Sequence, residues 1–319
     1  MNRYAVNLDQ IQEAHSRISR KISHTPVVEL DQLSKKLNFD LRLKAENLQR
    51  GGSFKLRGAT NAILSLTGSL GSRGVIAHSS GNHAAALASA ATANDIKATI
   101  VMPRDTSERK INAVMAYGVS PVFCEPSSRA REQATQEIID QTHAHLIHAY
   151  DDPDVIAGQG TVGLEILEQV KDADSILAPI GGGGLLAGIL VAAKTLNPKI
   201  RVWGCEPTNA DDAFRSLEKG AIQNPTRYDT VADGLRTAVG KITFPIIQSL
   251  VDGILLVDEE EIIQATRQMV LEARLVAEPS GAVTLAAANR YANQFHGQTV
   301  VAVVSGGNLD MSHCKLGHS

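Results

Sequence analysis

The sequence of 319 residues has few of the features that mark a stapled or metal-stabilised protein. It contains only three cysteines, Cys124, Cys205 and Cys314, which lie far apart. An odd number of distant cysteines is unlike a disulfide framework or a zinc cluster, so we expect free thiols and a cytoplasmic location. Aromatic residues make up 4% of the chain, so we expect a mainly aliphatic core.

Neither sign of charge dominates the chain. It has 31 lysines and arginines against 34 aspartates and glutamates, a formal net charge of -3, and no run of five like charges. Proteins that bind nucleic acids or anionic membranes usually carry a basic patch or stripe. We therefore expect a small-molecule partner, no nucleic acid and no membrane.

Long hydrophobic runs are also scarce. Asp9 interrupts the first residues before an apolar run can develop, which is unlike a secretory signal peptide. The uncharged stretch 175–193 has nearly the length of a membrane span, but Pro179 and four consecutive glycines lie inside it. This stretch predicts a strand, a turn and a helix.

The sequence does have short β-branched segments that alternate with segments rich in alanine and leucine. The strand-like segments are 41–47, 74–80, 97–103, 120–126, 175–180, 201–207 and 299–307. Between them, 82–94 and 185–196 have the length and composition of helices. The alternation predicts an α/β fold with buried, mainly parallel strands.

The grouping of the strands predicts two domains. Strands near Val75, Thr99, Val119 and Leu146 form a compact group, and no low-complexity linker divides the chain. We place a small α/β domain at 75–149, inserted into a larger domain that is built from 1–74 and 150–319.

Four glycines, Gly181, Gly182, Gly183 and Gly184, follow one of these strands and precede an apolar helix. Without Cβ atoms, their N–H groups can surround a phosphate at the positive end of the helix, although a tight turn for packing is an alternative. Gly182, Gly184 and Ala187 also match the dinucleotide pattern G-x-G-x-x-A, with Glu206 about 20 residues further on as a ribose-binding acid. An NAD-dependent dehydrogenase is therefore an alternative, but it gives Lys55 no role.

Polar groups follow two other strands. Ser79, Ser80 and Asn82 lie at the start of a predicted helix, where they suit a carboxylate, although Ser80 or Asn82 could instead cap the helix. Ser305 and Asn308 end the last strong strand and could hold a ring nitrogen or a phosphate.

Lys55 lies between apolar Phe54 and Leu56, just after two glycines. Partial desolvation would lower the pKa of its amine and make it a nucleophile, whereas most lysines are solvated surface charges.

His143, His145 and His148 crowd together without a carboxylate or cysteine at ligand spacing, which favours a cluster at a strand edge over a metal site.

Taken together, four motifs resemble fold type II enzymes of pyridoxal 5'-phosphate (PLP), the tryptophan synthase β-like group. The motifs are S-F-K-x-R-G-A (53–59), S-S-G-N-H (79–83), G-G-G-G-L (181–185) and S-G-G-N (305–308). Further matches at 155–161, 205–212, 231–234 and 277–282 occur in family order. The nearest resemblance is to serine racemases and to serine/threonine and 3-hydroxyaspartate dehydratases, which implies two doubly wound α/β domains with open, mainly parallel sheets.

The resemblance implies a role for each matched residue. Lys55 would form a Schiff base with PLP, Phe54 would pack beside it, Asn82 would bind the ring hydroxyl, and Ser305 would face the pyridine nitrogen. The phosphate would lie on Gly181 to Gly184, and the substrate carboxylate among Ser79, Ser80, Asn82 and His83. Arg131 and Arg236 are candidates for reading a second, distal carboxylate, although either could be a surface arginine.

A metal site is also implied. Glu206, the carbonyl group of Ala210 and Asp212 match the family's divalent-cation site, and oxygen ligands favour Mg²⁺, Ca²⁺ or Mn²⁺ over zinc. The alternative is a pair of surface carboxylates beside a turn.

The implied reaction is β-elimination from serine, threonine or 3-hydroxyaspartate to give a 2-oxo acid and ammonia. Lys55 would take the Cα proton, and Ser80, on the opposite face, could return one and so racemise serine. A serine at the ring nitrogen holds it protonated less firmly than an aspartate, which favours loss of the β-hydroxyl group. A non-catalytic amino-acid sensor is the other alternative, disfavoured by the presence of both Lys55 and Ser80.

The sequence departs from the family pattern at two places. Ala84-Ala85 replaces the usual Gly-Gln, which could reshape the substrate pocket, and Arg50-Gly51 replaces the usual residue-Thr, which puts a nucleotide-effector site in doubt. We expect a homodimer, and no C-terminal regulatory domain because the sequence ends 14 residues after Ser305.

Overall fold

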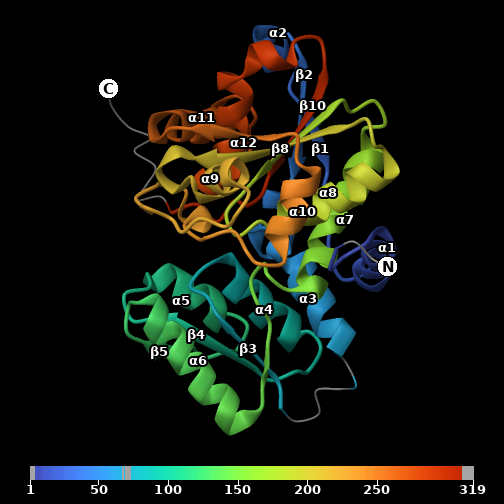
Figure 1. Cartoon of the computed structure of the whole chain (residues 1–319). Helices are drawn as coiled ribbons and strands as arrows, with labels where there is room; N and C mark the ends of the chain where they lie inside the picture. Colours follow the sequence, from blue (N-terminus) through green and yellow to red (C-terminus); the bar gives the residue numbers. More distant parts are fainter. Residues whose placement is uncertain (1–3, 67, 69–72, 311–319) are drawn as a thin grey trace.

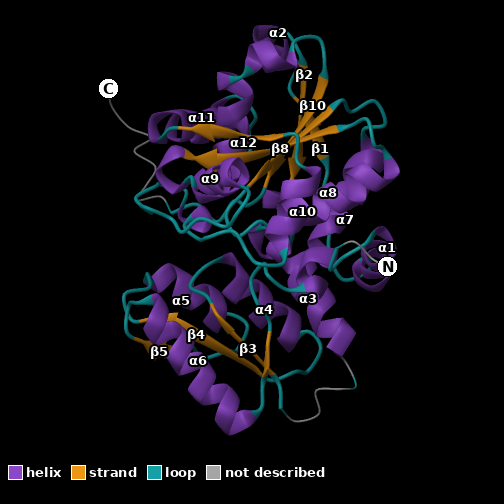
Figure 2. Cartoon of the chain, in the orientation of Figure 1, coloured by secondary structure: helices purple, strands orange, loops and turns teal. Residues whose placement is uncertain are grey.

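The chain forms two lobes, each built around one sheet (Figures 1 and 2). The computed structural model describes residues 4–66, 68 and 73–310. The larger sheet has six strands in the order β1-β2-β10-β7-β8-β9. Their bounds are β1 (Val27–Glu29), β2 (Asp40–Ala45), β7 (Ser175–Pro179), β8 (Arg201–Pro207), β9 (Gly253–Val257) and β10 (Thr299–Val304). Only β1 is antiparallel to its neighbour in this sheet.

The smaller sheet has four parallel strands in the order β5-β4-β3-β6. They are β3 (Val75–His78), β4 (Ala98–Pro103), β5 (Val122–Cys124) and β6 (His145–Leu146). The helices of this lobe are α4 (Asn82–Thr92), α5 (Glu108–Met115) and α6 (Ser128–Thr142). All four strands lie within 75–149, while the domain boundary itself stays a prediction.

Both faces of the larger sheet are buried, as the alternation along β10 shows. Val301 and Val303 belong to one hydrophobic cluster, together with residues of α7 (Pro153–Gln169) and α8 (Gly184–Leu196). Val300, Ala302 and Val304 belong to another, with residues of α11 (Glu259–Leu271) and α12 (Pro279–Arg290). Because successive side chains of a strand point to opposite faces, helices must cover both. The predicted α/β fold with doubly wound, mainly parallel sheets is confirmed.

The remaining elements complete the two lobes. The helices are α1 (Leu8–Ile18), α2 (Asp31–Leu37), α3 (Lys55–Leu66), α9 (Asp212–Lys219) and α10 (Thr243–Leu250). Short 3-10 helices are η1 (Glu46–Leu48), η2 (Arg50–Gly52), η3 (Thr208–Ala210), η4 (Asp233–Leu235) and η5 (Ala292–Phe295). Figure 1 shows α3, α4 and the segment that leads into α7 where the two lobes meet.

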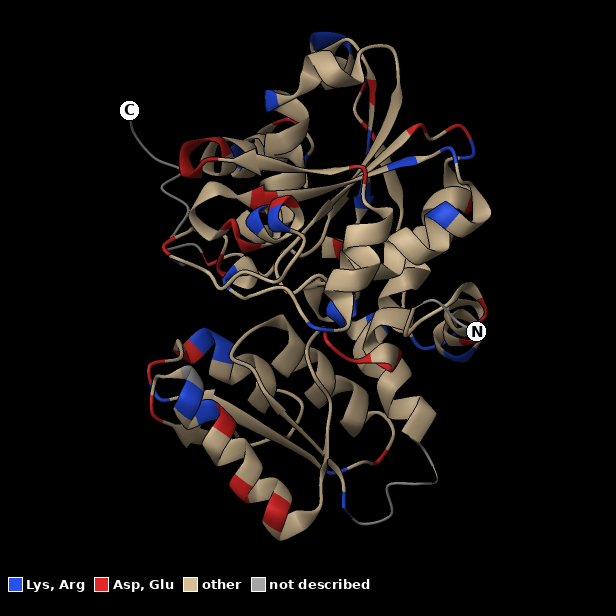
Figure 3. Ribbon diagram, viewed as in Figure 1, with Lys and Arg blue, Asp and Glu red and all other residues tan. Residues whose placement is uncertain are grey.

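The uncharged stretch 175–193 forms β7 and most of α8, as its proline and glycines predict. Among the residues that the structure describes, no helix is both long and apolar enough to cross a membrane. Lysine and arginine are interspersed with aspartate and glutamate on both lobes in the view of Figure 3.

Candidate active site

Lys55 is the first residue of α3 and follows a sharp turn. Gly51 and Gly52 both have a φ of +75°, a left-handed conformation that glycine adopts without strain. The Lys55 Nζ atom donates a 2.8 Å hydrogen bond to the carbonyl oxygen of Ala149 and lies 5.0 Å from the centre of the Phe54 ring. Burial lowers the pKa of the Lys55 amine to about 8, so a sizeable fraction is neutral near physiological pH.

The segment that carries Lys55 lies beside the end of β10. Phe54 donates its backbone N–H to the carbonyl oxygen of Ser305 at 3.1 Å, and Ser53 forms a β-bridge with Gly306. The Ser305 hydroxyl is buried and lies 3.4 Å from the carbonyl oxygen of Ser280. Two of the four motifs are therefore neighbours in space.

Asn308 connects this pair to the start of α4. Its side-chain amide lies 2.9 Å from the Gly51 carbonyl oxygen and 2.8 Å from Oδ1 of Asn82, and donates to both. A Cβ atom on Gly52 would lie 2.6 Å from Oδ1 of Asn308, so a larger residue at this position would displace the Asn308 amide. A third motif, S-S-G-N-H, thus meets the other two.

The four-glycine loop joins β7 to α8 and contacts Tyr150. A Cβ atom on Gly182 would lie 2.3 Å from the Tyr150 ring, and one on Gly184 would lie 2.9 Å from the Tyr150 carbonyl oxygen. Tyr150 follows Ala149, the hydrogen-bond partner of Lys55, so the loop and the lysine amine share this segment. The close packing that the alternative predicts is therefore present in this loop.

The N–H groups of this loop suit an anion. Within the described residues, those of Gly181, Gly182 and Gly183 donate to no acceptor, and they lie at the positive end of the 13-residue helix α8. Unpaired N–H groups at a helix N-terminus bind phosphates. These donors fit the phosphate group of PLP, and the partly neutral Lys55 amine fits its aldehyde group.

Ser80 does not cap α4. The N-cap is Gly81, and in the described part of the chain no side chain caps this helix, so the capping alternative for Ser80 and Asn82 is wrong. Ser79 Oγ accepts the N–H of Gly81 at 3.3 Å. Ser80 and Asn82 are half-buried, which leaves the Ser80 hydroxyl available to a ligand.

His83 is buried beneath this loop. Its Nε2 atom lies 3.1 Å from the carbonyl oxygen of Ile147, which can only accept, so Nε2 carries the proton. Burial, together with the nearby charge of Lys55, lowers the pKa of His83 to about 3, and the ring is therefore neutral. Nδ1 has no partner among the described residues and is available as an acceptor.

The histidines of the 143–148 segment do not converge. His143 ends α6 in a left-handed conformation, His145 lies in β6, and the His148 ring packs edge-on against His78 and Tyr150. No group of three His, Cys, Asp or Glu side chains among the described residues could hold a metal ion.

Glu206 and Asp212 are buried, so the alternative of two surface carboxylates is wrong. The Glu206 oxygens accept the N–H groups of Ala213 and Phe214, each at 2.9 Å, and Asp212 Oδ2 accepts that of Val239 at 2.9 Å. Burial raises the pKa of Asp212 to about 6 and that of Glu206 well above its ordinary range, with Asp212 raising the latter further.

One oxygen of this pair has no partner. Oδ1 of Asp212 is buried and accepts no hydrogen bond from the described residues. Ala210 lies in η3, which connects the two carboxylates along the chain. Two neighbouring carboxylates with a spare oxygen fit a divalent cation, whereas a buried Glu206 is unsuited to bind a ribose.

The two candidate arginines differ in their surroundings. Arg236 is exposed, and its Nε atom donates to the Thr230 carbonyl oxygen at 2.9 Å. Arg131 is half-buried in α6 and, after burial itself, is the main cause that lowers the pKa of His78. Arg131 therefore lies near His78 at the end of β3, while a role for either arginine stays a prediction.

Two residues of the site, Tyr150 and Glu278, are not indicated by the sequence alone. Tyr150 packs on Gly182 and shares a 2.9 Å hydrogen bond with Thr237. Glu278 is 7% exposed, and burial together with the nearby Asp233 raises its pKa to about 7, although the hydrogen bond from Asn82 opposes this rise. The segment 277–282 matched the family, but nothing in it indicated that the acid faces Asn82.

A family model described as "Pyridoxal-phosphate dependent enzyme" matches residues 18–306, and the chain belongs to this family. It is 45% identical over 311 residues to the serine racemase of Dictyostelium discoideum, covering 96% of each chain. It is 39% identical over 308 residues to the β-hydroxyaspartate dehydratase of Paracoccus denitrificans, covering 97% of this chain and 98% of that one.

Solved structures give the same result. The maize serine racemase matches with a TM-score of 0.94 at 40% identity, covering 97% of this chain and 95% of that one. The T.th. threonine deaminase matches with a TM-score of 0.91 at 42% identity, covering 95% of this chain and 99% of that one. The predicted membership of fold type II PLP enzymes is confirmed, and the alternative of an NAD-dependent dehydrogenase is wrong.

Proposed function

We propose that this serine racemase-like PLP enzyme eliminates water from a β-hydroxy amino acid, and that uptake of one water in the following hydrolysis gives a 2-oxo acid and ammonia. We propose that it also interconverts the enantiomers of serine. The observation that carries the proposal is the position of the Lys55 amine. It is half-buried, has a pKa of about 8, and lies against the segment that contacts the four-glycine loop. The relatives of this chain include both racemases and dehydratases.

Bound PLP supplies an electron sink for negative charge at the substrate Cα atom. Lys55 holds the cofactor and then takes the Cα proton, for which its lowered pKa suits it. Gly181 to Gly184 would hold the phosphate and Ser305 would face the ring nitrogen. Asn82 would bind the ring hydroxyl, and Phe54 would pack beside the ring. The hydroxyl groups of Ser79 and Ser80 and the N–H groups at the start of α4 bind the substrate carboxylate, with Asn82 and His83 beside them.

Ser80 serves the face of the substrate opposite Lys55. Its half-buried hydroxyl caps no helix in the described structure, so it is available to deliver or remove a proton. Arg131 binds the distal carboxylate when the substrate is 3-hydroxyaspartate, and Arg236 is the second candidate for this role.

Glu206, the Ala210 carbonyl group and Asp212 bind Mg²⁺, or Ca²⁺ or Mn²⁺ in its place. Support comes from the two buried carboxylates and the unpaired Oδ1 of Asp212.

We also propose a homodimer, for which Leu48 and Val276, 51% and 55% exposed, are candidate contacts. Analytical ultracentrifugation tests the oligomeric state.

Borohydride reduction followed by peptide mapping tests the cofactor assignment. We expect the PLP label on Lys55 and none in Lys55→Ala. The purified enzyme is then assayed with L-serine, D-serine, L-threonine and both diastereomers of 3-hydroxyaspartate, with 2-oxo acid and enantiomer as readouts. A label on another lysine overturns the assignment, and bound PLP without turnover of any of these compounds favours the amino-acid sensor.

A further inference from the structure

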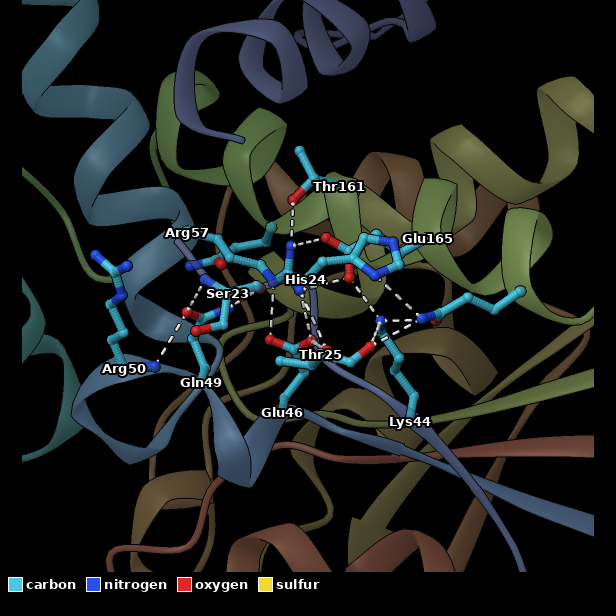
Figure 4. A network of polar contacts seen from close by, with 12 residues as sticks. Ser23, His24, Thr25, Lys44, Glu46, Gln49, Arg50, Arg57, Thr161 and Glu165 are labelled. Atoms are coloured by element: carbon cyan, nitrogen blue, oxygen red, sulfur yellow. Dashed lines mark hydrogen bonds and ion pairs between the residues drawn. The ribbon is translucent and has the colours of Figure 1, made fainter. Parts of the chain in front are cut away.

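Four charged side chains form a buried ion cluster behind the Lys55 helix. The cluster consists of Lys44 on β2, Glu46 in η1, Arg57 on α3 and Glu165 on α7 (Figure 4). Each of these side chains is at most 2% exposed. Two positive and two negative charges balance, because buried charges need partners of opposite sign.

Arg57 binds both carboxylates of the cluster with two hydrogen bonds each. Its Nε and Nη2 atoms donate to Glu46 at 2.8 and 2.7 Å, and its Nη1 and Nη2 atoms donate to Glu165 at 2.6 and 2.8 Å. Nη1 also donates to Thr161 Oγ1 at 3.1 Å. The planar guanidinium is the only side chain with a donor pattern that can fix two carboxylates in this way.

Lys44 belongs to the same cluster but not to the Lys55 helix. Its ammonium group donates to the Thr25 carbonyl oxygen at 2.7 Å, to Glu165 at 2.5 Å and to Gln169 at 2.9 Å. None of these three partners lies on α3. Lys44 therefore supports Glu165, whereas Arg57 connects Glu165 to α3.

The helices α3 and α7 are in backbone contact beside this cluster. A Cβ atom on Gly158 would lie 2.7 Å from the Arg57 carbonyl oxygen and 2.7 Å from the Cα atom of Gly58. Gly58 also donates its N–H to Gln159 Oε1 at 3.2 Å. The motifs 53–59 and 155–161 thus pack against each other, and the motif on α7, to which the catalytic proposal gives no role, supports the one that carries Lys55.

The directions of Lys55 and Arg57 follow from helix geometry. Residues two apart on an α-helix are separated by about 200° around its axis, so their side chains point to nearly opposite sides. Arg57 points toward η1 and α7, and Lys55 reaches Ala149 in the site. When Arg57 is fixed on one side of the first turn, the direction of Lys55 on the other side is therefore fixed as well.

We infer that Arg57 is a positioning residue for Lys55: by binding Glu46 and Glu165 together, it holds the first turn of α3 so that the lysine amine faces the four-glycine loop. The inference rests on the proposed function of Lys55. Stability alone is a weak reason for such a cluster, because buried ion pairs are often replaceable by apolar residues without loss. A fixed direction for the reacting amine does require groups that bind in one geometry.

The test compares Arg57 with Lys44 in the full-length enzyme with its cofactor. Arg57→Lys keeps the charge but cannot bind two carboxylates bidentately, and Arg57→Met with Glu46→Gln keeps the cluster neutral. Lys44→Met disturbs the same cluster without touching α3. The readouts are the visible circular dichroism of the bound cofactor, kcat and KM, and hydrogen exchange of peptides covering 54–63, each beside the melting temperature.

We expect both Arg57 changes to weaken the visible circular dichroism and to lower kcat about 10- to 100-fold, with KM within about threefold, because a displacement near 1 Å costs about this much. Amides of 54–58 should exchange roughly tenfold faster. Lys44→Met should lower the melting temperature while all three signals stay near those of the parent.

Parental signals in Arg57→Lys overturn the inference, as does an equal loss in Lys44→Met. If the double variant does not fold, Arg57→Lys alone decides. An inactive parent contradicts the proposed function, whereas hydrogen exchange and circular dichroism still test whether Arg57 holds the first turn of α3.

Discussion

The side-chain amide of Asn82 donates a 2.6 Å hydrogen bond to the buried carboxyl group of Glu278. Asn82 begins α4 in the smaller lobe, and Glu278 is the N-cap residue of α12 in the larger lobe. The same Asn82 accepts the amide of Asn308 at 2.8 Å. The residue proposed to bind the ring hydroxyl of the cofactor is therefore held by two residues of the larger lobe, and one of them, Glu278, has a pKa of about 7.

The first prediction concerns the pH dependence of stability. Burial raises the pKa of Glu278 from 4.5 to about 7, so between these values the folded chain holds a proton that the unfolded chain has lost. Its contribution to the free energy of unfolding is full below pH 4.5 and is lost as the pH rises toward 7. The full shift corresponds to roughly 3 kcal/mol. Glu278→Gln should remove this loss, which urea unfolding at pH 5, 6, 7 and 8 measures.

Taking the difference between parent and variant removes opposing contributions. The pKa values of His83 and His148 are lowered to about 3 and about 4, mainly by burial. Both groups therefore reduce the free energy of unfolding as the pH falls. That trend is opposite in sign and common to both proteins. Glu272→Gln, at an exposed position, is the control and should leave the profile unchanged. Parallel curves for the parent and Glu278→Gln would contradict the prediction.

The second prediction is that Gly158→Ala separates α3 from α7. The new methyl group would lie 2.7 Å from backbone atoms of Arg57 and Gly58, which cannot yield as a side chain can. We expect a loss of about 1–3 kcal/mol in the free energy of unfolding, typical of overpacking, and a lower kcat. Urea unfolding and steady-state kinetics measure the two effects.

Gly163→Ala is the matched control on the same helix. Its new methyl group would first meet the Cβ atom of Ala192, at 3.1 Å, which is a tight contact but not a severe clash. Equal effects of the two substitutions would show that the approach at Gly158 has no special importance.

The third prediction is that a chelator lowers both the activity and the melting temperature, and that Mg²⁺ restores both. Without a cation, Oδ1 of Asp212 is a buried acceptor with no partner in the described structure, close to a second carboxylate. Asp212→Asn should abolish the response to the chelator. Asp211→Asn is the control, because Asp211 pairs with Arg215 at 2.8 Å in a partly exposed ion pair. A chelator with no effect on the parent enzyme leaves no role for a cation at these residues.

The alternation of strand and helix was predictable because it depends on local pattern. In β10, five apolar residues follow Thr299, and in α8 an apolar run follows four glycines, so length and flanking residues identify both. The strand β9 (Gly253–Val257) was missed, since GILLV is too short for its pattern to separate strand from helix.

The buried ion cluster could not be predicted from the sequence. Lys44 and Glu165 are 121 positions apart, and a charged residue is normally expected at the surface. Similarly, the Lys55 segment was recognised by its motif, but its contact with Ala149 depends on how the lobes pack. Motifs identified the reacting groups, whereas the groups that hold them follow from tertiary contacts.

The last prediction separates racemisation from elimination through Ser80→Ala. Elimination from an L-substrate requires removal of the Cα proton on the Lys55 face and loss of the hydroxyl group, whereas racemisation also requires proton delivery from the other face. We expect the variant to lose L-to-D interconversion of serine and to keep much of its dehydration of L-serine. Dehydration of D-serine, in which Ser80 would itself be the base, should weaken. Chiral chromatography and a 2-oxo acid assay measure the three rates.

The structure simplifies the control for this experiment. Because the N-cap of α4 is Gly81 and no side chain in the described chain caps this helix, Ser80→Ala should change the free energy of unfolding by no more than about 0.5 kcal/mol. Cofactor content and melting temperature should therefore match the parent, and any change in stereochemistry reports on the hydroxyl group itself. A folded, cofactor-loaded variant that racemises serine at the parental rate would rule out Ser80 as the second base. A parent that never racemises serine is better described as a dehydratase, in which Ser80 delivers no proton to the substrate Cα atom.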